Sequence, residues 1–202
     1  TRATIAKEKG LEPFAAYILL QNAKEPLEET AKQYISEEKE VKTVAEAIAG
    51  AKDIIAESIS DNADYRTWIR RTTMKKGKIV SAAKDQESES VYEMYYEFEE
   101  PVSKLAGHRI LALNRGEKEK FLNVKVEAPE DEILTYLEKK TVHRDNPYTA
   151  AVLKETVDDS YHRLIAPAIE REVRNELTEK AEDGAIVVFG KNLQQLLMQP
   201  PV

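Results

Sequence analysis

The fold is decided by one stretch near the end of the chain: Pro167-Ala-Ile-Glu-Arg-Glu-Val-Arg-Asn-Glu-Leu-Thr-Glu-Lys-Ala-Glu-Asp-Gly184 and its continuation to Gln199. Proline suits the first turn of a helix and stops one elsewhere, so Pro167 and Pro200 mark its limits. An apolar stripe recurs at every fourth position: Ile169, Val173, Leu177, Ala181 and Ala185. That step overshoots a helical turn by about 40°, so the stripe winds around the helix. We predict a long helix against which earlier helices pack on changing sides.

The segment Ala185-Ile-Val-Val-Phe189 admits two interpretations. It is apolar on every side, which for a helix indicates burial of the far end. Asp-Gly before it and Gly-Lys-Asn after it are turn signals around a β-branched run, which is typical of a buried strand. Periodicity supports helix and strand about equally.

Composition sets limits on the class of protein. The chain has 202 residues, 42% of them hydrophobic and 33% charged, as in one large or two small soluble domains. Proteins that coat DNA are usually basic, whereas this chain has a net charge of −7, so any nucleic-acid contact must come from a local patch. The chain has no cysteine and no long apolar run, so we expect no disulfide, no thiolate zinc site and no membrane span. We expect a cytoplasmic protein, and both ends look cut from a longer chain.

Local signals predict a mainly α, multihelical domain around the long C-terminal helix, with a short strand or two. Thr43 and Glu46 form a capping box before one helix, Asp61 caps the next, and Gly116 ends a later one. We expect the tyrosine-rich segment 91–98, whose secondary structure stays open, to supply core residues. The expected helices span 3–10, 11–21, 26–35, 44–59, 61–74, 101–105, 107–115, 129–140 and 147–164, and the expected strands span 78–83 and 121–126.

The sequence lacks the usual motifs of catalysis and of metal or cofactor binding. His108, His143 and His162 are far apart without ligand spacing, and no nucleophile elbow occurs. The segment 184–191 fails as a phosphate loop, because its glycines are one residue too far apart and Asn192 replaces Ser or Thr. We expect no cofactor, no metal and no enzyme activity. A catalytic cleft would have to come from scattered residues such as His108, Arg109 and Glu117, and we expect His108 and Arg109 instead to hold helix ends together.

The charge pattern indicates one candidate binding site. Every ionic residue from Arg66 to Lys84 is basic, and every one from Asp85 to Glu100 is acidic. Helix, turn, basic helix and strand over 43–84 outline a helix-turn-helix subdomain with a wing. The candidate nucleic-acid-binding residues are Arg66, Arg70, Arg71, Lys75, Lys76 and Lys78. Two simpler explanations compete: cations suit a helix C-terminus, and the acidic segment folds back onto them.

Several stretches together resemble the Tex family of bacterial transcription accessory proteins. They are Ile5-Ala-Lys-Glu-Lys-Gly-Leu-Glu-Pro13, Ala45-Glu-Ala-Ile-Ala-Gly-Ala-Lys-Asp-Ile-Ile-Ala-Glu57, His108-Arg-Ile-Leu-Ala-Leu-Asn-Arg-Gly-Glu117 and Glu170-Arg-Glu-Val-Arg-Asn-Glu-Leu-Thr-Glu-Lys-Ala-Glu182. The resemblance spans essentially all of residues 1–202. It implies the N-terminal helical region of a multidomain, nucleic-acid-binding protein that resembles a eukaryotic elongation factor. A degenerate RNase H-like domain, helix-hairpin-helix modules and an OB-type RNA-binding domain would follow it. Because the family is helical here, the resemblance favours a helix over 185–189.

The resemblance implies a function as well. We expect a non-enzymatic scaffold region of a transcription accessory protein, positioning downstream nucleic-acid-binding domains. Nucleic acid would be bound mainly through domains absent from this chain. The alternative is a protein-interaction module that docks on the transcription machinery.

Overall fold

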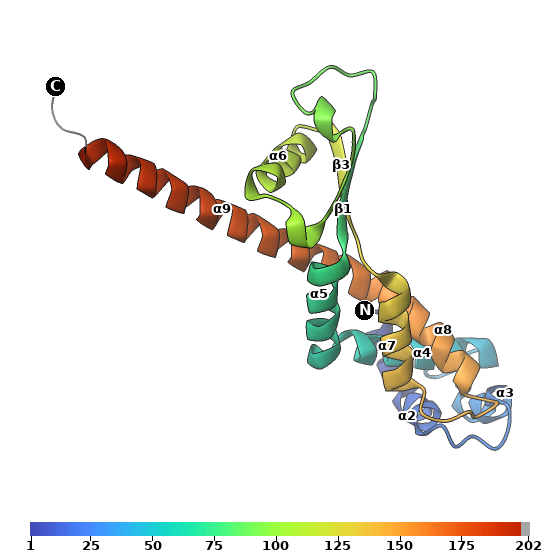
Figure 1. Ribbon diagram of the computed structural model, residues 1–202. Helices are drawn as coiled ribbons and strands as arrows, with labels where there is room; N and C mark the ends of the chain where they lie inside the picture. The colour runs from blue at the N-terminus through green and yellow to red at the C-terminus, as the bar shows by residue number, and fades with distance from the viewer. Residues whose placement is uncertain (199–202) are drawn as a thin grey trace. The chain divides into compact units, whose positions relative to one another are not determined.

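The computed structural model describes residues 1–198, with backbone only for residues 185–189 and Asn192. The described chain is mainly helical with one small sheet, which confirms the predicted fold class (Figure 1). It divides into two compact units. Unit 1 comprises residues 1–68 and 130–168, and unit 2 comprises residues 69–129 and 169–202.

Unit 1 is helical and is organised around α4 (Val44–Ser60). The helices that pack against it in this unit are α1 (Arg2–Glu8), α2 (Glu12–Leu20), α3 (Leu27–Ala31) and α8 (Ala150–Asp159), and α7 (Glu130–Thr141) packs against α8. Thr43 caps α4 as predicted, because its hydroxyl accepts a hydrogen bond from the Glu46 amide at 3.1 Å. The Glu46 carboxylate reaches back to the Lys42 amide at 2.9 Å, one residue beyond the usual capping-box partner. The inward face of α4 carries Ala47, Ala51, Ile55 and Ala56, each 0% exposed.

A buried glutamine joins the end of α2 to the end of α7. Gln21 adopts a left-handed φ of 57° at the C-cap of α2 and is 4% exposed. Its side-chain amide donates to the Thr141 carbonyl at 2.9 Å, and its oxygen accepts from the His143 amide at 2.9 Å. One polar side chain therefore satisfies a carbonyl that α7 leaves open at its C-terminus and an amide of the loop that follows.

Unit 2 contains a three-stranded antiparallel sheet, in which β1 (Lys78–Ala83) pairs with β2 (Glu97–Pro101) on one side and with β3 (Leu122–Glu127) on the other. Ile79, Leu122 and Val124 turn inward from it. The predicted tyrosine core is confirmed, with Tyr92 and Tyr95 at 5% and 4% exposure. The helices of this unit are α6 (Gly107–Lys118), part of α5 (Ala63–Lys76) and most of α9 (Ala166–Met198). Short 3-10 turns lie at Glu93–Tyr95 and Val102–Lys104 in this unit and at Lys32–Tyr34 in unit 1.

The predicted long helix is confirmed as α9, and residues 185–189 are helical in it. The stripe is buried at 3% for Ile169, 0% for Val173, 8% for Leu177 and 6% for Ala181. The expected burial of side chains 185–189 lies outside the described residues. Pro167 lies in the first turn of α9, as predicted, and the helix begins one residue earlier, at Ala166. It continues from a π-helical segment, Ser160–Ile165, in which the Ala166 amide bonds to the Tyr161 carbonyl. Pro167, which has no amide donor, follows directly after this wider turn.

Three other local predictions are wrong in detail. Gly116 does not end α6, which continues to Lys118. A Cβ at Gly116 would lie 2.4 Å from Leu122 Cδ1, so this glycine permits close packing. Asn62, not Asp61, caps α5, because its side chain accepts the Tyr65 amide at 3.1 Å. Pro101 closes strand β2 and precedes only a short 3-10 turn.

Candidate nucleic-acid interface

The six candidate cations lie along α5 and at the start of β1. Arg66 belongs to unit 1, and the other five belong to unit 2. The helix-turn-helix over 43–84 remains a prediction. Its helices and strand form as α4, α5 and β1, and the division between the units falls inside α5.

Arg66 forms hydrogen bonds within its own unit. Its Nε donates to the Ser60 carbonyl at 2.5 Å and its Nη2 to the Ser60 hydroxyl at 3.1 Å. Ser60 is the last residue of α4 and only 3% exposed. The guanidinium therefore caps a helix C-terminus, where a cation also complements the dipole.

Two further candidates pair with carboxylates. Arg70 Nη1 lies 3.5 Å from Glu172 Oε2 on α9. Lys78 Nζ lies 2.7 Å from Glu99 Oε1 on the neighbouring strand β2, and this hydrogen bond raises the pKa of the lysine. The Glu99 contact comes from the acidic segment, as the competing explanation predicts.

Among the six candidates, Arg71 and Lys75 are the two cations without a partner in the described residues. Both side chains are exposed, and they stand four residues apart on α5, a spacing that puts them on one face. Within the part of the chain that the structure describes, neither has a hydrogen-bond or ion-pair partner. Lys76 is also exposed but has an interaction of its own. The candidate interface therefore narrows to a small cationic patch, Arg71, Lys75 and Lys76, at the C-terminal end of α5.

The residues that an enzyme would have needed take structural positions. Arg109 Nη1 lies 3.4 Å from Glu100 Oε2, and its guanidinium carbon lies 5.6 Å from the centre of the Phe98 ring. Glu117 pairs with Arg174 at 2.9 Å. Arg109 therefore links α6 to strand β2, where the sequence predicted that it holds helix ends together, and Glu117 links α6 to α9.

Arg174 is the most connected residue that sequence reasoning missed. Its spacing of four residues from Glu170 predicts a surface helix pair between the two side chains. Its Nη2 instead reaches α6, 2.8 Å from Asn114 Oδ1 and 2.9 Å from Glu117 Oε1, and its side chain is only 18% exposed. Asn114 also donates to the Thr178 hydroxyl at 2.8 Å. Glu170 accepts from the Val126 amide of β3 at 3.2 Å. Partners about sixty positions away leave no local sequence signal.

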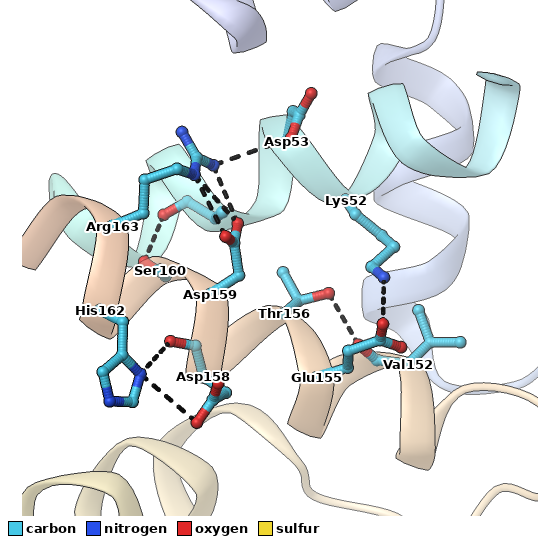
Figure 2. A network of polar contacts seen from close by, with 11 residues as sticks. Lys52, Asp53, Val152, Glu155, Thr156, Asp158, Asp159, Ser160, His162 and Arg163 are labelled. Atoms are coloured by element: carbon cyan, nitrogen blue, oxygen red, sulfur yellow. Dashed lines mark hydrogen bonds and ion pairs between the residues drawn. The ribbon is translucent and has the colours of Figure 1, made fainter.

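A second polar network lies in unit 1, between α4 and the turn after α8 (Figure 2). Arg163 Nη2 lies 2.9 Å from Asp159 Oδ2 and 3.7 Å from Asp53 Oδ1. The arginine hydrogen bond lowers the pKa of Asp159, whereas burial raises the pKa of Asp53. Ser160 donates to the Ala56 carbonyl at 2.6 Å. The network fastens the π-helical turn to the central helix.

His162 in this network makes stability depend on pH. Its Nδ1 lies 3.0 Å from the Asp158 carbonyl, and its Nε2 contacts Glu130. The Asp158 backbone bond, followed by the Glu130 carboxylate, raises the pKa of His162 above its ordinary value. The stabilisation is therefore complete below the unfolded pKa and is lost as pH rises through the folded one. We expect His162→Gln to flatten this decline in urea unfolding between about pH 6 and pH 8. An unchanged pH profile would contradict it.

Comparison with known proteins finds a matching family model. It is described as Tex central region-like, and the match covers residues 21–189. The description refers to the central region of Tex proteins, whereas the resemblance seen in the sequence implied their N-terminal region. Among the residues that the structure describes, no helix is both long and apolar enough to cross a bilayer.

Curated relatives align with the whole chain. Uncharacterized protein YdcI of Bacillus subtilis is 56% identical over 205 residues, which are 28% of its length. Protein tex of Bordetella pertussis is 33% identical, with 27% of its length covered. S1 RNA-binding domain-containing protein 1 of Homo sapiens is 30% identical, with 21% covered. The chain thus spans about a quarter of the length of these relatives.

Proposed function

Since this chain belongs to the Tex family, we propose that it is a non-enzymatic scaffold region, which positions nucleic-acid-binding parts of a transcription accessory protein. The observation that carries the proposal is the way unit 2 holds α9. Arg174 ties the helix to α6, Glu170 ties it to β3, and the apolar stripe is buried beside them. A helix held by polar bonds and by packing keeps a fixed direction, which is what a positioning element requires.

The names of relatives support the nucleic-acid side of the proposal. One is called a transcriptional accessory protein, and another is named for an RNA-binding domain. The polar side chains described above join helices, strands and turns. The proposed role needs none of them for chemistry.

We further propose that Arg71, Lys75 and Lys76 supply a weak phosphate contact. Exposed cations on one helix end attract a phosphate backbone without reading sequence, and each contact adds to the salt dependence of binding. Three charges are too few for tight binding against a net charge of −7. The patch would assist an interface formed elsewhere in the longer relatives.

The patch is tested by measuring the affinity of this chain for single-stranded RNA and duplex DNA at several salt concentrations. Arg71→Ala with Lys75→Ala is expected to weaken binding several-fold and to lower the salt slope by about 1 to 2. The matched control is Lys32→Ala with Lys180→Ala, which removes two lysines that form exposed helix pairs elsewhere. Equal losses in both double variants, or no loss in either, would contradict the assignment.

A further inference from the structure

A groove in unit 1 has no role in the function proposed above. It has a volume of about 460 Å³ and is lined by residues of α1, α2 and α4 and of the turn after α4. Its apolar lining includes Ala15, Leu19 and Ile54. Leu19 is 40% exposed, although its neighbours on α2, Phe14 and Ile18, are 0% exposed. Ala15 and Ile54 are 2% and 7% exposed, so Leu19 is the large aliphatic side chain of the groove that is open to solvent.

The polar lining of the groove is acidic. It contains Glu12, Glu57 and Asp61, against the single cation Lys7. Glu12 lies in the first turn of α2, and Glu57 accepts a hydrogen bond from the Thr1 hydroxyl at 3.0 Å. Helices thus supply the apolar floor of the groove and two of the three carboxylates of its acidic edge, Glu12 and Glu57, whereas Asp61 lies in the turn after α4.

We propose that this groove binds a short amphipathic helix of a protein partner, with aliphatic residues on one face and lysine or arginine beside them. A groove between helices that exposes an aliphatic side chain, Leu19, can receive the apolar stripe of such a segment. The acidic edge selects basic flanking residues, which raises the association rate and excludes acidic partners. The groove lies wholly in unit 1, and its role does not depend on the scaffold role of α9.

Charge separates this occupant from two others. Nucleic acid would bring phosphates against three carboxylates, which repel them. A second copy of the chain carries a net charge of −7, so two copies would also repel each other at this edge. A basic helix is the occupant that gains from both the apolar floor and the acidic edge.

The test uses the 202-residue chain and two synthetic helical peptides of about 14 residues, or four turns. Both carry the same leucine stripe, one flanked by lysines and the other by glutamates. Isothermal titration should detect the lysine peptide, with the glutamate peptide at least about tenfold weaker. Leu19→Glu should weaken the lysine peptide by about tenfold or more. The matched control is Val91→Glu, which adds the same charge at an aliphatic residue that is 86% exposed and belongs to unit 2.

A charge reversal keeps the proposal testable even if Leu19→Glu perturbs folding. Glu12→Lys should weaken the lysine peptide and strengthen the glutamate peptide, and a loss of fold cannot produce that crossover. Three results would overturn the proposal. They are equal affinity for both peptides, no effect of Leu19→Glu in a folded variant, and a dimer of the chain alone that Leu19→Glu dissociates. The last would assign the groove to a second copy.

Discussion

Gly77→Ala is expected to lower the free energy of unfolding by about 3 kcal/mol. A Cβ at this position would lie 2.5 Å from the Thr73 carbonyl oxygen and 3.1 Å from that of Glu127. Both atoms are backbone, so neither can move without disturbing the end of α5 or the β1–β3 pairing. The glycine amide also donates to Thr73 at 2.8 Å, and its carbonyl accepts from Val102 at 2.9 Å. Urea unfolding followed by circular dichroism measures the change.

Gly184→Ala is the matched control for that substitution. This glycine is inside α9, and a Cβ added to it would meet nothing within 4 Å. Alanine there removes backbone entropy from the unfolded chain and should stabilise by about 0.5 to 1 kcal/mol. Destabilisation by both substitutions, or by neither, would show that the close approach at Gly77 is not what requires glycine.

Arg174→Ala is expected to cost about 2 to 3 kcal/mol, because it removes charged hydrogen bonds from a largely buried position. Asn114 and Glu117 would lose their partner, and so would the Val124 carbonyl, which Arg174 Nη1 approaches at 3.4 Å. A Glu117→Ala double-mutant cycle, measured by urea unfolding, should give a coupling energy above about 1 kcal/mol.

Lys180→Ala provides the comparison on the same helix. Lys180 pairs with Glu176 at 3.3 Å, but its side chain is 65% exposed, so its loss should change stability by less than about 0.5 kcal/mol. If the two α9 variants were equally stable, the network around Arg174 would not be what holds α9 in unit 2.

Features with a local cause could be predicted from the sequence. The limits of β1 follow from a short β-branched run after Gly77, and the observed strand has the predicted range. The Thr43 cap and the buried stripe of α9 likewise depend on residues a few positions apart. The helical state of residues 185–189 did not follow from periodicity and required the family resemblance.

Features that depend on distant partners could not be predicted. Strand β2, Glu-Phe-Glu-Glu-Pro, is acidic and poor in β-branched residues, and it forms because β1 offers it an edge. The basic patch was visible in the sequence as a run of charge. Its division into partnered cations, such as Arg66 and Arg70, and open ones, such as Arg71, depends on Ser60 and Glu172, which no spacing rule connects to them.

The scaffold role of α9 is tested most directly by the affinity of a full-length relative for single-stranded RNA. The Bacillus subtilis relative is suitable, because it is 56% identical and aligns with the whole chain. A flexible Gly-Ser insertion of about six residues after the position of Gly184 would uncouple the two ends of the helix. The predicted result is a loss of about tenfold or more in affinity, with Gly184→Ala at the same position unchanged. An insertion variant that binds RNA as tightly as the intact protein would contradict the scaffold role.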